Sequence, residues 1–143
     1  MRNSTSLEMS RRLKLVKAMD GKENTSRIYG RIPYTLRYVE LYGWRLLFRF
    51  LFISRVASYH FDSLITTLHG RLEDADSPDN FIHLQIAYDE HTKAYTAYYE
   101  YRGHKKNGVI ILSPVDGSVF SSSNICDTLA QLIVWSSENG YLR

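Results

Sequence analysis

Residues of the types that perform catalysis are present in this chain, but their spacing supports no particular reaction. The five histidines have no metal-ligand spacing, and a single cysteine, Cys126, gives no support to a zinc site of the common thiolate kind. His60 stands two residues before Asp62 at an expected helix start, which favours capping over catalysis. No glycine-rich segment lies between a strand and a helix to bind phosphate. We therefore expect a protein that is not an enzyme and that carries no metal and no cofactor.

The most distinctive chemistry lies between Tyr42 and Tyr59, in the sequence YGWRLLFRFLFISRVASY. On a helix at about 100° per residue, its three arginines share one broad side and two phenylalanines lie on or near that side. The remaining apolar side chains form a face typical of a buried helix. Rings among guanidinium groups suggest a surface that a partner covers, or arginine stems that lie over the rings within the folded monomer. The candidate partner-binding residues in this stretch are Arg45, Phe48, Arg49, Phe52 and Arg55.

Neither a membrane span nor a secretory route is expected. Each arginine would cost about 2.5 to 3.5 kcal/mol at the centre of a spanning helix, and a span needs about 20 mostly apolar residues. The first residues, MRNSTSLEMSRR, lack the apolar core of a secretory signal, and one cysteine permits no internal disulfide. The natural compartment on this interpretation is a reducing cytoplasm.

The charge is divided unevenly along the chain, whose net charge is +3. Residues 1–58 carry twelve Arg or Lys against four acids, a balance of +8, whereas residues 59–143 carry six against eleven, a balance of −5. The split predicts an anionic partner for the first half: nucleic acid, an acidic protein or a membrane surface. It also agrees with basic helices that pack against the acidic half of the same domain. The candidate phosphate-contacting residues are Arg11, Arg12, Lys14, Lys17, Arg27 and Arg31.

Tyrosine is unusually frequent, with eleven residues, five of them between Tyr88 and Tyr101. Three explanations remain open: strands favour aromatic residues, tyrosines are common in protein interfaces, and exposed tyrosines can stack on bases. Tyr98, on the face of its strand opposite Tyr99, is the sixth candidate partner-binding residue.

The first half is predicted to be helical. Capping-box spacing at Thr5 and Glu8 predicts a helix from about Ser6 to Met19, followed by a loop over residues 22–31. Pro33 suits a first helical position, so a second helix is expected to start there. Either Gly43 bends it, or it continues through the arginine-rich stretch to about Ser58. A short helix capped by Asp62 precedes an acidic loop at residues 73–80.

The second half is predicted to be a sheet closed by a helix. From Phe81 the apolar period becomes two, which predicts strands over residues 81–88, 94–102, 109–112 and 118–120, with a hairpin connection from Gly103 to Gly108. A last helix, capped by Ser122, Ser123 or Asn124, carries an apolar stripe and ends at Asn139-Gly140. Cys126 lies beside that stripe and is expected to be packed rather than nucleophilic.

These elements together predict one α+β domain over residues 1–143. It consists of a basic helical half (1–72), an acidic loop (73–80), a three- to four-stranded antiparallel meander (81–120) with the N-terminal helices on one face, and a closing C-terminal helix (122–139). The leading hypothesis is a small binding protein that regulates, inhibits or escorts a protein partner, with a homodimer as one arrangement. The second hypothesis is nucleic-acid binding through the basic half.

Overall fold

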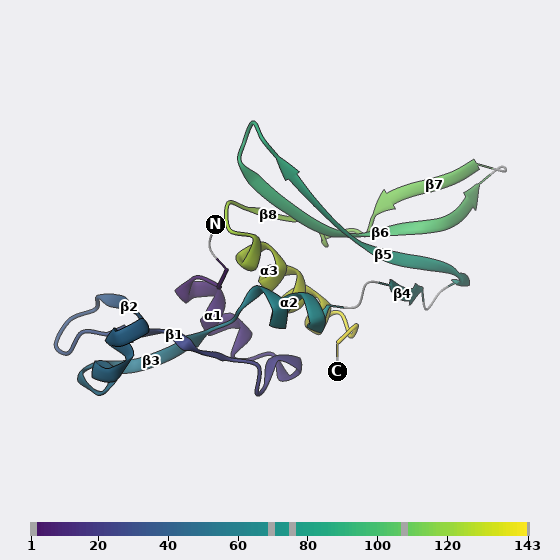
Figure 1. Cartoon of the computed structure of the whole chain (residues 1–143). Helices are drawn as coiled ribbons and strands as arrows, with labels where there is room; N and C mark the ends of the chain where they lie inside the picture. Colours follow the sequence, from purple (N-terminus) through teal and green to yellow (C-terminus); the bar gives the residue numbers. More distant parts are fainter. Residues whose placement is uncertain (1–2, 69–70, 75–76, 107–108, 143) are drawn as a thin grey trace.

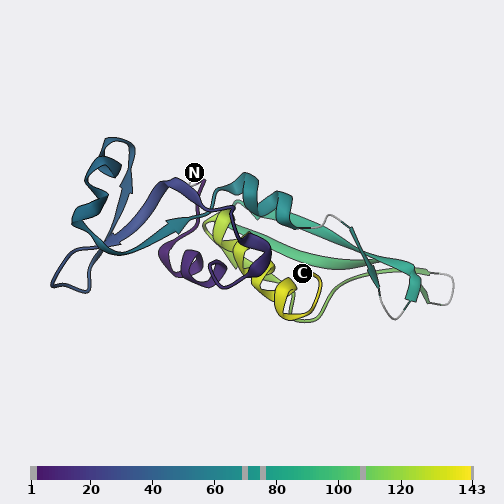
Figure 2. The same ribbon diagram turned by 90° about the horizontal axis from the view of Figure 1, so that it is seen from below.

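The chain folds into a mixed α+β structure with two separate antiparallel sheets (Figure 1). The computed structural model describes residues 3–68, 71–74, 77–106 and 109–142. In both views the two sheets lie on opposite sides of a central group of helices, so the molecule is elongated (Figures 1 and 2).

The larger sheet contains β4 (Arg71–Asp74), β5 (Ser77–Asp89), β6 (Ala94–Lys106) and β7 (Val109–Pro114) in that order, and β8 (Phe120–Ser122) also pairs with β6. The alternation seen in the sequence is confirmed, because Ile82, Ala97 and Tyr99 are buried on one face.

The central helices are α1 (Leu7–Leu13), a 3-10 turn η1 (Lys17–Met19), α2 (Phe61–Thr67) and α3 (Ile125–Glu138). Helix α3 contacts β6, β8, α1 and α2, and its stripe of Leu129, Leu132 and Ile133 is fully buried. The main core therefore surrounds α3.

The N-termini of α1, α2 and α3 are capped by polar side chains. Ser6 caps α1, one residue after the predicted Thr5, and His60 rather than Asp62 caps α2. Asn124 caps α3 and Asn139 stands at its C-cap, both as the sequence indicates.

The smaller sheet overturns the prediction for residues 22–58. In place of a loop followed by a long helix, the chain forms β1 (Asn24–Arg31), β2 (Tyr38–Tyr42), the 3-10 helix η2 (Gly43–Leu51) and β3 (Ile53–Ser58), with sheet order β2-β1-β3. The predicted apolar face of that helix is not in the core either, since no residue of η2 is buried. The sheet of the second half packs on α3 instead.

Smaller corrections concern the second half. Residues 73–74 and 77–80 of the predicted acidic loop belong to strands, and residues 103–106 extend β6 instead of forming the hairpin connection. The larger sheet consequently has five strands rather than three or four. The last two residues of the predicted hairpin connection, 107 and 108, lie outside the described residues. Among the described helices, none is long and apolar enough to cross a membrane.

Candidate functional site

The smaller sheet and η2 form a basic, poorly buried projection, which we call the basic lobe (residues 24–58). It contains six arginines and one acid, Glu40. Its sheet has an inner face turned toward the N-terminal segment and α1, and an outer face covered by η2 and the residues that follow it.

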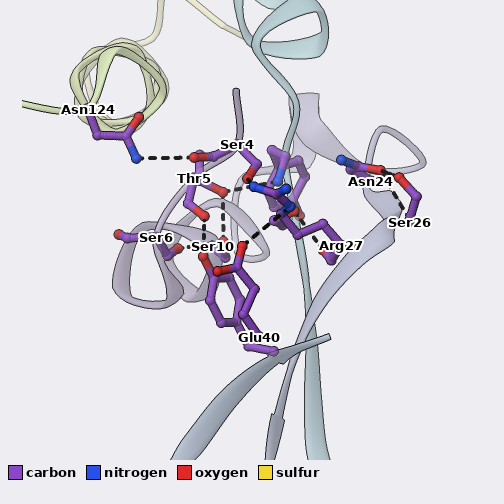
Figure 3. Close-up of polar contacts among 12 residues, drawn as sticks. Ser4, Thr5, Ser6, Ser10, Asn24, Ser26, Arg27, Glu40 and Asn124 are labelled. Carbon is purple, nitrogen blue, oxygen red and sulfur yellow. Dashed lines mark hydrogen bonds and ion pairs between the residues drawn. The ribbon is translucent and has the colours of Figure 1, made fainter. Parts of the chain in front are cut away.

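The inner face is joined to the rest of the molecule by polar contacts (Figure 3). Tyr29 donates its hydroxyl hydrogen bond to the carbonyl of Thr5 at 2.8 Å. The guanidinium of Arg27 lies 3.4 Å from the Glu40 carboxylate and 3.5 Å from the Ser4 hydroxyl. This face is therefore occupied by contacts within the chain.

On the outer face, the side chain of Phe52 packs closely against the backbone of Gly30. Gly30 lies beneath Phe52, and a Cβ placed on Gly30 would stand 2.6 Å from the Cβ of Phe52 and 3.4 Å from a methyl of Leu41. Gly30 pairs with Val39, and Ile28 pairs with Leu41, so these four residues share the face that Phe52 covers. The lobe thus has a small apolar interior of its own.

The side chains of η2 follow a period of three. In a 3-10 helix, residues i and i+3 eclipse each other, which places Trp44, Leu47 and Phe50 on one line. These three are 69%, 72% and 70% exposed. We call them the apolar ridge.

A groove runs on the β2 side of η2. It has a volume of about 320 Å³ and is mainly apolar, being lined by Val39, Glu40, Leu41, Arg45, Phe48, Leu51 and Phe52. Trp44 meets Phe48 edge to face at 6.1 Å between ring centroids, and this contact supports one wall.

A second hollow lies on the β1–β3 side of η2. Its volume is about 500 Å³, and it is lined by Thr25, Ile28, Arg49, Arg55 and Ala57. Two guanidinium groups from different elements therefore share one open space.

Five of the six predicted partner-binding residues lie in the basic lobe, around η2. Arg45 and Phe48 line the groove together with Phe52, whereas Arg49 and Arg55 line the hollow. Arg45 also lies over the rings of Tyr42 and Trp44, at 5.4 Å and 6.0 Å, so for this residue arginine does cover aromatic rings within the chain.

Tyr98 is not part of this surface. It lies on β6, opposite Gln85 on β5, in the sheet on the far side of the helices. The structure therefore separates it from the other five residues.

The predicted phosphate-contacting residues lie in two different parts of the molecule, the N-terminal helical segment and the basic lobe. Arg11, Arg12, Lys14 and Lys17 are exposed on or beside α1 and η1. Arg11 lies over the Tyr38 ring at 4.5 Å. Arg27 is paired with Glu40 and packs over Tyr42, and Arg31 ends β1 beside the turn at residues 34–36.

The candidate catalytic groups do not assemble into a reactive cluster in the described part of the chain. No group of three His, Cys, Asp or Glu residues that could hold a metal occurs there. Burial, with a smaller contribution from Asp127, raises the pKa of the Cys126 thiol to about 12, so the thiol is protonated at neutral pH. His60 accepts a hydrogen bond from the backbone of Asp62 at 3.2 Å, which is the expected capping role.

Sequence reasoning missed the apolar ridge, because it assigned these side chains to the core. The spacing of Trp44, Leu47 and Phe50 by three was the available signal. It also missed Thr25 in the hollow, for which the sequence holds no signal.

Comparison of the chain with protein-family models, curated proteins and solved structures finds no match. The class that the structure defines is an α+β protein with two antiparallel sheets, one of which carries an exposed surface of arginine and aromatic residues.

Proposed function

We propose that this chain is a non-enzymatic binding protein that regulates, inhibits or escorts a protein partner, and that the basic lobe is its binding surface. The observation that carries the proposal is the exposure of the apolar ridge. Trp44, Leu47 and Phe50 lie in line on the outside of η2, with none of them buried by the rest of the chain.

The composition of this surface favours a protein partner. Interface cores are enriched in Trp, Phe and Arg, and a few such residues usually carry most of the binding energy. A short helix that presents apolar residues in line is also a recurrent way for one protein to enter a groove on another. The partner would bury the ridge and meet Arg45 and Arg49 beside it.

The test compares a ridge variant with a matched control. The variant replaces Trp44, Leu47 and Phe50 by Ser. The control replaces Leu15 and Val119, which are exposed apolar residues outside the basic lobe, by Ser. Affinity capture from the source cell, followed by calorimetry with the purified partner, should show binding by the wild type and the control and a loss of at least about a hundredfold for the ridge variant. Retention of no specific protein by the wild type, or equal retention by the ridge variant, would refute the proposal.

A second copy of the chain is the alternative occupant of the ridge. Light scattering on gel filtration separates the two cases: a dimer that the ridge substitutions dissociate assigns the surface to self-association, and a monomer assigns it to another protein.

Nucleic-acid binding is the second candidate function. It is favoured by the exposure of four basic side chains on one segment, Arg11, Arg12, Lys14 and Lys17. Phosphate contacts release counterions, so binding should weaken steeply with salt. Undetectable affinity for mixed DNA and RNA at low salt would eliminate this candidate.

A further inference from the structure

The hollow beside η2 has a defined floor and two charged walls. Ile28 and Ala57 are register partners on neighbouring strands and form its apolar floor. Arg55 precedes Ala57 by two residues and therefore projects from the same face of β3. Arg49 approaches from η2, and Thr25 from β1 completes the lining.

The two arginines of this hollow have no acidic partner among the described residues. The one acid of the basic lobe, Glu40, is paired with Arg27, which contacts the N-terminal segment through Ser4. Two guanidinium groups that line one space repel each other, and an anion between them would remove that repulsion. The lining therefore favours an anionic ligand.

One of the two guanidinium groups is already oriented. Nη1 of Arg49 donates a hydrogen bond to the backbone carbonyl of Leu46 at 3.1 Å. The remaining N–H groups of a planar guanidinium fit an oxyanion through paired hydrogen bonds. Holding the side chain in advance lowers the entropic cost of binding.

The position of the apolar groove specifies the source of the anion. The groove lies on the β2 side of η2 and the hollow on the β1–β3 side, one helix apart. A ligand that fills both must present an acidic group and an apolar group at a fixed spacing. A polypeptide segment with acidic and apolar residues meets that requirement.

We propose that the hollow lined by Arg49, Arg55 and Thr25 is an oxyanion site that binds a carboxylate of the partner protein, while an apolar side chain of the same segment enters the groove across η2. This inference rests on the proposed function and specifies the chemistry of the partner: a segment that combines Asp or Glu with Leu-like residues.

A direct test uses model peptides and does not require the partner. The probes are acetyl-Leu-Glu-Leu-Leu-amide, the same peptide with Gln in place of Glu, and inorganic phosphate. Titrations are followed through the side-chain Nε–H signals of Arg49 and Arg55 in NMR spectra. The Glu peptide should shift both signals saturably and bind about tenfold more tightly than the Gln peptide.

Two double variants test whether the preference for the Glu peptide arises from Arg49 and Arg55. Arg49→Gln with Arg55→Gln should remove the preference for Glu over Gln. Arg12→Gln with Lys14→Gln, which changes the net charge equally at exposed positions outside the basic lobe, should retain it. Unchanged circular dichroism confirms that both variants fold.

Several results would overturn the inference. Equal affinity for the Glu and Gln peptides, or no saturable shift with the Glu peptide, shows that no carboxylate site exists. Tighter binding of phosphate than of the Glu peptide assigns the hollow to phosphate. Binding to phosphatidylserine vesicles that Arg49→Gln with Arg55→Gln abolishes assigns it to a membrane surface.

The proposed function and the oxyanion site can be refuted independently of each other. A ridge variant that still binds the partner refutes the use of the ridge, whatever the peptides do. A partner that requires the ridge but binds the Arg49→Gln, Arg55→Gln variant with full affinity refutes the oxyanion site alone.

Discussion

Of the two glycines in the basic lobe, Gly30 is crowded and Gly43 is not. The backbone of Gly30 does not adopt a left-handed conformation, so replacing it by Ala would ordinarily gain about 0.4 to 1 kcal/mol from the unfolded chain. Here the added Cβ would stand 2.6 Å from the Cβ of Phe52, which is fixed to the backbone and cannot rotate away. The steric cost of overpacking, about 1 to 3 kcal/mol, outweighs the entropic gain.

We therefore expect Gly30→Ala to lower the free energy of unfolding by about 1 kcal/mol in urea denaturation, the difference between the middle values of these two effects. Phe52→Ala keeps the closest atom and should not relieve the clash, whereas Phe52→Gly should reduce the cost of Gly30→Ala in a double-mutant cycle. A Gly30→Ala protein as stable as the wild type would show that Phe52 does not pack over Gly30.

Burial of Cys126 makes the free energy of unfolding decrease at alkaline pH. Burial raises the pKa of its thiol from 9.0 to about 12, so the folded state holds the proton more tightly than the unfolded state. The contribution is complete below about pH 9 and is lost as the pH rises toward 12, with a limiting slope of about 1.4 kcal/mol per pH unit for one group.

Cys126→Ala should therefore flatten the decline in the free energy of unfolding between pH 9 and the folded pKa. The cost of the small cavity that it leaves is independent of pH and shifts the whole curve. Tyr59, whose pKa burial also raises to about 12, titrates in both proteins and cancels in the comparison. Parallel curves for the two proteins would contradict this assignment.

Among the elements, η2 and α3 carry similar apolar residues in opposite situations. Leu47 is exposed on the ridge, and Leu132 is fully buried in α3. Leu47→Ala should change the free energy of unfolding by less than about 0.5 kcal/mol, whereas Leu132→Ala should lower it by about 2 to 5 kcal/mol. Urea denaturation of the two variants measures both. A large loss for Leu47→Ala would mean that the ridge is covered in solution.

The elements that could be predicted from the sequence are those whose period matches a large core. In α3, Leu129, Leu132 and Ile133 recur at the spacing of an α-helix and all face the core. In β5 and β6 the alternation is long enough to identify strands, and Ile82 and Tyr99 are buried as it indicates.

The basic lobe could not be predicted in the same way. Strands β2 and β3 are five and six residues long, too short for a clear period. The 3-10 helix between them spaces its side chains by three, so an α-helical interpretation joined ridge and groove residues into one apolar face. That interpretation also assumed that dense apolar residues are buried. The positions of Arg45, Arg49 and Arg55 around η2 follow from this local geometry, and sequence spacing alone did not provide it.

At the scale of the whole molecule, Thr5 links the basic lobe to the main core. Its backbone N–H donates to the carbonyl of Tyr59 at 3.0 Å, and its hydroxyl accepts from the N–H of Tyr59 at 3.0 Å. The same hydroxyl contacts that of Ser10 in α1, and its carbonyl accepts from Tyr29 of β1. Thr5 is fully buried, so these polar groups have no access to water as an alternative.

Thr5→Val keeps the shape of this side chain but removes the hydroxyl. The N–H of Tyr59 then loses its acceptor in a buried position, at a cost of about 1 to 3 kcal/mol. Because Tyr59 follows β3 directly, the loss should fall mainly on the junction between lobe and core. Native-state hydrogen exchange should show faster exchange at Ile28 and Gly30 in β1, with a smaller change at Leu129 and Ile133 in α3.

The matched control is Thr66→Val, which removes a hydroxyl that bonds to the carbonyl of Asp62 at 2.7 Å on the exposed side of α2. It should leave exchange in β1 unchanged. Equal acceleration in β1 and α3 on Thr5→Val would show that lobe and core unfold as one cooperative unit. Selective acceleration in β1 would show that the lobe can open while the core stays folded. A partner bound across η2 would then stabilise the lobe by an amount that rises with the logarithm of its concentration divided by its Kd.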